Sequence, residues 1–263
     1  MQSVIQEIFK PARKNFPRRP VIMTGLNDLW QADLADLKNY SRENSGFRYI
    51  LVIINCFTKF AYAVPIRTKS DENVASAFAS IFKEHKAPEN LQVDKGTEFY
   101  NKECKKLFKK YNINLYSTHS GLKATIVERF ISTLKDKMWK LFALQGNYNY
   151  TKILSKIIDE YNNTKHRTIK MKSKDVTEKH EKLLLKTVYN YKNNNEKFKF
   201  KVGDKVRISK FKHLFSKSYT PNYTTEIFTI RKVQPPFPPT YLLEDYKKNP
   251  LEGGFYEQEL LKS

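Results

Sequence analysis

Cysteine and zinc-ligand patterns are scarce in this sequence. Among 263 residues there are only two cysteines, Cys56 and Cys104, and they lie far apart. This count argues against a disulfide framework and suits a reducing compartment. The five histidines stand in no zinc-ligand spacing with these cysteines, so the sequence predicts no zinc site.

Long apolar runs are also lacking. The longest ones are too short to span a bilayer, and the first residues have no apolar region of a signal peptide. No convincing amphipathic Lys/Arg helix of the membrane-binding kind is present. We therefore expect a soluble intracellular protein with no membrane partner and no secretion signal.

Positive charge is abundant. The chain has 48 Lys and Arg against 27 Asp and Glu, a net charge of +21. Such an excess needs an anionic partner, and nucleic acid is the first candidate, with ribosomal-type RNA binding left open by charge alone. Residues 167–217 hold 16 Lys and Arg against 5 Asp and Glu. Their density favours salt-dependent phosphate contacts over a merely solvated surface.

The order of hydrophobic patterns indicates an α/β fold. Residues 47–57 form a near-continuous apolar run, as a central buried strand should. The full prediction is strands at 29–37, 47–57 and 59–66, a helix at 71–86, a strand at 90–93, a helix at 99–111, a strand at 113–116, and helices at 124–144 and 150–164. This order gives a five-stranded mixed sheet flanked by helices. The first three strands should be antiparallel, and the last two parallel to the first.

Four segments are predicted along the chain. They are an extended basic arm at 1–28, in which the sequence allows a short helical turn at 4–9, the α/β core at 29–167, a basic linker with one helix at 168–198, and a small β-barrel at 199–263. The barrel strands are expected near 202–208, 227–233, 241–244 and 254–257. Four aromatic residues there could form a cage or pack in the core, and packing is the favoured reading: Tyr219, Tyr223, Phe228 and Tyr241.

Three carboxylates fall where such a sheet would bring them together. Asp33 lies within the first strand, Asp94 ends the fourth, and Glu128 begins a helix that must cross the sheet. Carboxylate oxygens suit hard divalent cations, and two such ions can assist phosphodiester chemistry. Asp36 should point to the opposite face from Asp33. Glu98 fits a cap or a surface carboxylate, and Glu128 alone could simply favour the helix dipole.

Ordered motifs carry a resemblance to a known family. They are WQAD at 30–33, FTKFA at 57–61, VDKGTEF at 93–99, KATIVERF at 123–130 and YNNTKHR at 161–167. Thirty-three residues separate Asp94 from Glu128. Together these motifs resemble the retroviral-type DDE integrase superfamily, with its RNase H-like core. They look closest to the integrases of Polinton/Maverick-type transposons. Ile131 and Ser132 depart from the family's pattern, which usually has Asn and often a basic residue there.

The resemblance implies a function and its cofactors. Asp33, Asp94 and Glu128 would be the catalytic metal ligands for Mg²⁺ or Mn²⁺, with two ions when DNA is bound. The protein would process the 3′ ends of a transposon or viral element and transfer them into target DNA as a homo-oligomer in a host nucleus. The terminal barrel resembles SH3-like or chromodomain-like modules, and DNA and histone tails both remain open as its ligand.

Basic residues near these motifs and in the basic stretch are predicted to contact DNA. They are Lys123, Arg129, Lys135, His166, Arg167, Lys205, Arg207, Lys210 and Lys212. Lys135 lies two turns beyond Glu128 on the same face and could equally be solvated. For His166 and Arg167 a structural role is as open as a backbone contact. Two rival functions are a domesticated or inactive integrase that binds DNA or chromatin, and an RNase H-type nuclease.

Overall fold

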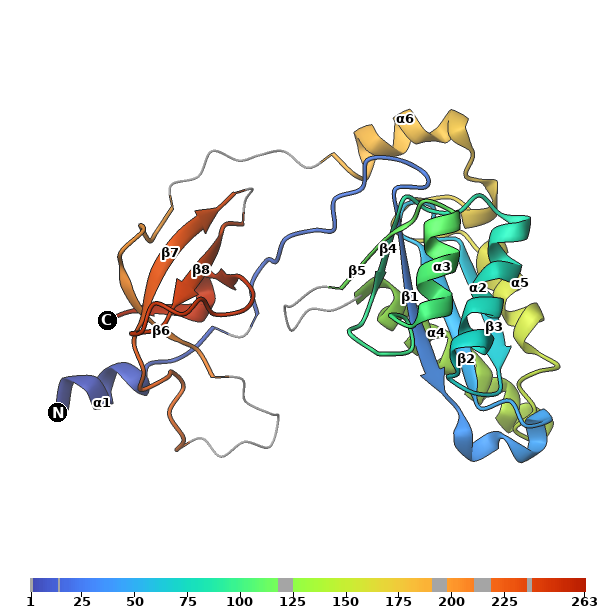
Figure 1. Cartoon of the computed structure of the whole chain (residues 1–263), viewed down its shortest axis with the longest axis horizontal. Helices are drawn as coiled ribbons and strands as arrows, with labels where there is room; N and C mark the ends of the chain where they lie inside the picture. The colour runs from blue at the N-terminus through green and yellow to red at the C-terminus, as the bar shows by residue number, and fades with distance from the viewer. Residues whose placement is uncertain (1, 14, 118–124, 191–197, 211–218, 236–237) are drawn as a thin grey trace. The chain divides into compact units, whose positions relative to one another are not determined.

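The computed structural model describes residues 2–13, 15–117, 125–190, 198–210, 219–235 and 238–263. The chain forms two compact units: Ile22–Asn190, and Met1–Val21 together with Tyr191–Ser263 (Figure 1). The arm predicted at 1–28 thus belongs mostly to the smaller unit, and the linker predicted at 168–198 lies in the core unit as far as Asn190. Within the described residues, no helix is long and apolar enough to cross a membrane.

The core unit contains the mixed five-stranded sheet that the sequence predicts. Its strands are β1 (Leu29–Asp36), β2 (Tyr49–Asn55), β3 (Ala61–Ile66), β4 (Asn90–Val93) and β5 (Asn114–Tyr116). Their order in the sheet is β3-β2-β1-β4-β5. The pairs β1–β2 and β2–β3 are antiparallel, whereas β1–β4 and β4–β5 are parallel. The predicted strand directions are therefore confirmed.

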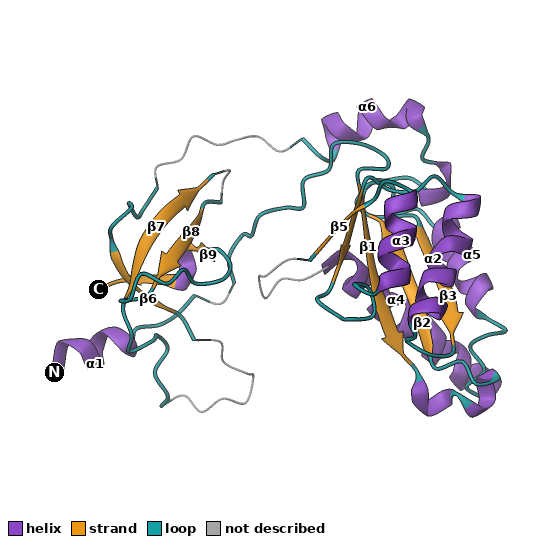
Figure 2. Ribbon diagram, viewed as in Figure 1, coloured by secondary structure: helices purple, strands orange, loops and turns teal. Residues whose placement is uncertain are grey.

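Helices cover both faces of this sheet (Figure 2). One face packs against α2 (Asp71–Glu84) and α3 (Lys102–Lys110), through side chains such as Phe78 and Phe108. The other packs against α4 (Thr125–Gln145) and α5 (Leu154–Asn163), through side chains such as Phe130 and Ile157. All seven residues of β2 are buried, as expected for a strand covered on both faces. Helix α3 starts later than predicted because the Asn101 side chain caps it, accepting from the Cys104 N–H at 2.7 Å.

Helix α6 (Glu178–Thr187) belongs to the core unit and is attached to its other elements by two contacts. The Tyr189 hydroxyl donates to the Phe57 carbonyl at 2.5 Å, and the two rings lie 4.7 Å apart. The Leu26 N–H donates to the Glu181 carboxylate at 3.0 Å. The helix predicted within the linker is thus attached to the core at both ends.

The smaller unit holds an antiparallel five-stranded sheet in the order β10-β6-β7-β8-β9. Four strands lie near their predicted positions: β6 (Lys205–Ile208), β7 (Phe228–Gln234), β8 (Thr240–Glu244) and β9 (Phe255–Tyr256). The fifth, β10 (Leu260–Lys262), was not predicted, and it closes on β6. Of the four aromatic residues considered for a cage, Tyr223, Phe228 and Tyr241 are buried, while Tyr219 is exposed.

The N-terminal arm completes this unit. It begins with α1 (Gln2–Ile8), close to the short helical turn that the sequence allows at 4–9. The Ile8 carbonyl accepts from the Asn222 and Tyr223 N–H groups at 2.8 and 3.0 Å. Further along, the Arg19 guanidinium donates to the Pro238 carbonyl at 2.9 Å. The Ile8 carbonyl and the Arg19 side chain therefore attach the arm to the rest of this unit.

Candidate active site

The pairing of β1 with β4 sets Asp33 beside Asp94. The two strands run parallel, with Ala32 opposite Val93. Asp33 follows Ala32, and Asp94 follows Val93. Alternation along β1 turns Trp30 and Ala32 towards α2 and α3, and Ala35 towards α4 and α5. Asp33 shares the face of Ala35 and lies half-buried beneath α4. Asp36 is exposed and pairs with Lys38 at 3.1 Å, so it is separate from this site.

Glu128 lies in the first turn of α4. The buried side chains of Val127, Phe130 and Leu134 fix that helix on the sheet, and Glu128 itself is exposed. The start of the helix is held by β1: the Gln31 carbonyl oxygen Oε1 accepts from the Ile126 and Val127 N–H groups at 3.0 and 3.1 Å. The helical turn that carries Glu128 is therefore held against β1, the strand that carries Asp33.

The pKa of Asp33 is affected by its burial and by the neighbouring acidic residues. Burial raises the pKa of Asp33; the Leu34 N–H, which donates to its carboxylate at 2.7 Å, opposes this. The charges of Asp94, Glu128 and Glu98 raise the pKa further. A cluster of like charges around one half-buried carboxylate is a site that a cation would stabilise.

Among these acidic residues, Glu98 has its negative charge balanced by a lysine. Its carboxylate pairs with the Lys69 ammonium at 2.7 Å. Burial acts to raise the pKa of Glu98, but the Lys69 contact outweighs it and the pKa is lowered. The sequence predicts a cap or a surface carboxylate for Glu98, and the structure shows a mostly covered side chain, 17% exposed, in this ion pair.

The donor set fits a hard divalent cation by its chemistry. Among the described residues, no three His, Cys, Asp or Glu side chains stand close enough to enclose an ion by themselves. Mg²⁺ usually keeps several waters and uses one or two carboxylates together with substrate phosphates. Asp33 and Asp94, with Glu128 above them, could hold an ion in this open manner.

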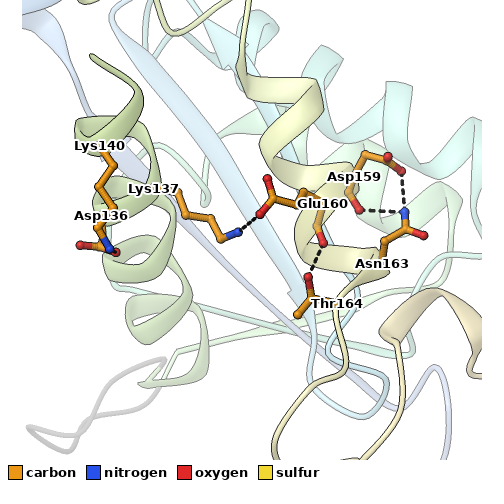
Figure 3. A network of polar contacts seen from close by, with 7 residues as sticks. All are labelled: Asp136, Lys137, Lys140, Asp159, Glu160, Asn163 and Thr164. Carbon is orange, nitrogen blue, oxygen red and sulfur yellow. Dashed lines mark hydrogen bonds and ion pairs between the residues drawn. The ribbon is translucent and has the colours of Figure 1, made fainter. Parts of the chain in front are cut away.

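The predicted DNA contacts have different surroundings. Arg129, Arg167, Lys205 and Lys210 are exposed, and Lys135 is half-buried. Lys123 and Lys212 lie outside the described residues. On α4, Lys137 pairs with Glu160 of α5 at 2.6 Å, and Lys140 pairs with Asp136 (Figure 3). In the described part of the chain, no carboxylate pairs with Lys135 or Arg129.

His166 is half-buried in a turn next to the core. Its Nδ1 accepts from the Thr168 N–H at 3.2 Å. Burial, with the nearby charges of Lys59 and Arg167, lowers the pKa of His166 to about 4. The ring is therefore neutral at pH 7 and offers no charge to a DNA phosphate.

The prediction that Arg207 contacts DNA is wrong, because its side chain is buried. Its side chain is only 3% exposed. The guanidinium donates to the Glu7 carboxylate at 3.1 Å and to the Thr225 carbonyl at 2.5 Å. A buried guanidinium with these acceptors holds α1 on β6 and does not reach a DNA phosphate.

Buried amide side chains are the site-forming residues that sequence reasoning missed. Gln31 and Gln92 are buried below the carboxylates, and Gln31 Nε2 donates to Gln92 Oε1 at 2.9 Å. Asn162 of α5 bonds both the N–H and the carbonyl of Ala61, each at 2.9 Å. A usable signal was present: Gln31 stands two residues before Asp33, hence on the same covered face of β1.

Comparisons with known proteins show similarity to integrase-type proteins. Residues 24–121 match the model of a family described as the integrase core domain. A transposon-derived protein of Caenorhabditis elegans is 32% identical over 193 residues, covering 73% of this chain and 65% of that protein. The Pol polyprotein of a feline endogenous virus is 26% identical over 141 residues, covering 52% of this chain and 13% of the polyprotein. The chain thus spans less than two thirds of the length of either relative.

The fold has solved counterparts. A chain from the intasome of simian T-cell lymphotropic virus aligns with a TM-score of 0.63 at 13% identity. The alignment covers 96% of this chain and 83% of the viral one. At this level of identity the likeness concerns the fold, and it supports an RNase H-like core followed by a small β domain.

Proposed function

Because this chain belongs to the retroviral-type DDE integrase superfamily, we propose that it is a metal-dependent polynucleotidyl transferase of a transposon or viral element. It would cut near the 3′ ends of the element DNA with water as nucleophile. The freed 3′ hydroxyl would then attack a phosphodiester of target DNA. The observation that carries this proposal is the position of Asp33 on β1 next to Asp94, the residue directly after the parallel strand β4, beneath the start of α4 that carries Glu128.

Each acidic residue has a distinct part in this proposal. Asp33 and Asp94, on adjacent strands, would hold the cation shared between them, and Glu128 would complete the set from the helix. Bound Mg²⁺ or Mn²⁺, two ions when DNA is present, would supply Lewis-acid activation and charge neutralisation. The ionised form of Asp33 is needed to receive a cation, so binding would release a proton whenever Asp33 is protonated.

Basic side chains would hold the DNA. Arg129 and Lys135 lie on the helix of Glu128, and Arg167 lies in the core unit beyond α5, and all three are proposed to contact phosphates. Lys205 and Lys210 offer charge on the smaller unit. Double-stranded element ends and target DNA are the proposed partners. Family members act as multimers that bridge two ends, so we propose a homo-oligomer working in the nucleus of a host cell.

The decisive experiment is a strand-transfer assay with purified full-length chain. Oligonucleotide duplexes with randomised termini serve as donors, a supercoiled plasmid serves as target, and Mg²⁺ or Mn²⁺ is added. Glu128→Gln should reduce the rate about 100-fold or more, since loss of a metal ligand removes several kcal/mol of transition-state stabilisation. Asp36→Asn is the matched control, because Asp36 is an exposed carboxylate of the same strand as Asp33. Strand transfer that survives Glu128→Gln would contradict the assignment.

A domesticated or inactive integrase is the second candidate, favoured by the transposon-derived relative and by Ile131 and Ser132 on α4. Such a protein would bind DNA or chromatin with salt-dependent affinity and show no metal-dependent joining in the same assay. An RNase H-type nuclease would instead cut RNA–DNA hybrids while leaving plasmid DNA intact, so a hybrid substrate separates the third candidate.

A further inference from the structure

Two buried glutamines link the strands that carry the aspartates. Gln31 and Gln92 are opposite each other in the parallel β1–β4 register. They are 0% and 5% exposed, and each stands two residues before an aspartate, Asp33 or Asp94. Gln31 Nε2 donates to Gln92 Oε1 at 2.9 Å. One side-chain hydrogen bond therefore ties together the two strands at a point just below the carboxylates.

The same glutamine also caps α4. The first N–H groups of a helix have no acceptor within the helix, and a side chain close in sequence usually satisfies them. Here Gln31 Oε1 accepts from Ile126 and Val127, residues 95 and 96 positions away. Gln31 thus contacts β4 through its nitrogen and α4 through its oxygen, so one side chain sets the spacing of all three elements that carry Asp33, Asp94 and Glu128.

We propose that Gln31 is a positioning residue that fixes Glu128 relative to Asp33 and Asp94 and so determines the affinity of this site for divalent cations. This inference rests on the proposed function, because it assigns Gln31 to the same metal site. Val127, whose N–H it binds, directly precedes Glu128, and any shift of that N–H moves the Glu128 backbone. A neutral amide also caps the helix without adding another negative charge beside Asp33.

The chain offers a matched control elsewhere in the core. Asn44 is 0% exposed, and its Oδ1 accepts from the Tyr150 and Thr151 N–H groups at 2.7 and 3.1 Å. It therefore makes the same kind of double contact, ahead of α5 instead of α4. Asn44→Leu should destabilise the core as Gln31→Leu does, but at a place where no proposed metal ligand is moved.

The test measures cation binding by the full-length chain without DNA. Mn²⁺ is titrated by calorimetry and by its effect on the melting temperature, while hydrogen exchange follows the amides of Ile126 and Val127. Gln31→Leu should weaken Mn²⁺ binding by about 10- to 100-fold, as losses of groups that orient metal ligands do, and should speed exchange at both amides. Asn44→Leu should leave Mn²⁺ affinity within about twofold of wild type on the same principle. Gln31→Glu should keep both amides protected, because a carboxylate still accepts from them.

A second variant guards against a failure to fold. Gln92→Leu removes the neighbour of Gln31 and leaves its two acceptor contacts, so it should weaken Mn²⁺ binding less than Gln31→Leu would. The inference is overturned if Gln31→Leu binds Mn²⁺ as tightly as Asn44→Leu does. If Gln31→Leu is unfolded, the same comparison is made between Gln92→Leu and Asn44→Leu. A wild-type chain that binds Mn²⁺ but joins no DNA would refute the proposed function alone. A wild-type chain that binds no Mn²⁺ in the absence of DNA would refute the inference, whereas the proposed function would still be decided by the strand-transfer assay.

Discussion

Replacing Arg207 with leucine should destabilise the smaller unit, with any loss of DNA binding following from that destabilisation. Arg207 lies on β6 with its side chain 3% exposed. Its guanidinium donates to Glu7 at 3.1 Å and to the Thr224 and Thr225 carbonyls at 3.3 and 2.5 Å. Leucine removes all three bonds and leaves the acceptors of α1 and of the loop before β7 unpaired.

The size of the effect follows from burial. Removing one member of a buried ion pair costs about 3–5 kcal/mol. The Glu7 side chain is 27% exposed and can regain water, which lowers that figure, whereas the two carbonyls lose a charged donor. We expect a loss of about 2–4 kcal/mol in the free energy of unfolding. For a unit of this size the melting temperature should fall by about 10 °C or more.

Hydrogen exchange in the full-length chain measures this locally. Amides of β6 and α1 should exchange faster in Arg207→Leu, while those of β1 and β2 in the core unit stay protected. Lys205→Leu is the control, because Lys205 is an exposed residue of the same strand. A double-mutant cycle with Glu7→Gln should give a coupling energy of about 1–2 kcal/mol. Unchanged exchange in Arg207→Leu combined with weaker DNA binding would refute the structural role and restore the DNA contact.

Two pH-linked predictions concern the core unit. Without metal, the Asp33→Asn variant should have a higher melting temperature than wild type near neutral pH. The pKa of Asp33 is raised in the folded protein, so ionisation of Asp33 lowers the free energy of unfolding as the pH rises through that pKa. Thermal scans between pH 4 and 8 test this, and an unchanged melting temperature contradicts it. His166→Gln should flatten the loss of stability as the pH falls from about 6.5 towards about 4, since protonation of His166 favours the unfolded chain. Urea titrations at several pH values test this, and an equal slope in both proteins would rule it out.

The core could be read from the sequence where local pattern and burial coincide. Strand β4 has the predicted bounds, and β2 lies inside the predicted apolar run, because a strand covered on both faces needs an uninterrupted apolar stretch. Strand directions followed from connection rules: short turns join antiparallel neighbours, and helices join parallel ones. Asp33 and Asp94 could be brought together by the same rules.

Contacts between distant segments could not be read in this way. The bond between Arg207 and Glu7 joins residues 200 positions apart, and an arginine in a stretch that also holds Lys205 and Lys210 gives no sign of being buried. Strand β10 has only three residues and is stabilised by pairing with β6, so its own pattern is too short to identify it. The capping role of Gln31 likewise depends on where α4 meets β1.

The two positions where α4 departs from the family's usual pattern have unequal weight. Ile131 is partly buried against the core, where an apolar side chain contributes to packing. Ser132 is exposed one turn beyond Glu128, on the helix surface that also presents Arg129. Lys137 is engaged by Glu160 and Lys140 by Asp136, although exposed pairs of this kind are weak. With serine at 132, the remaining cations of α4 are Arg129, Lys135, Lys137 and Lys140. Lys137 and Lys140 would have to break an ion pair before contacting a phosphate, whereas Arg129 and Lys135 form no ion pair with a carboxylate of the described residues.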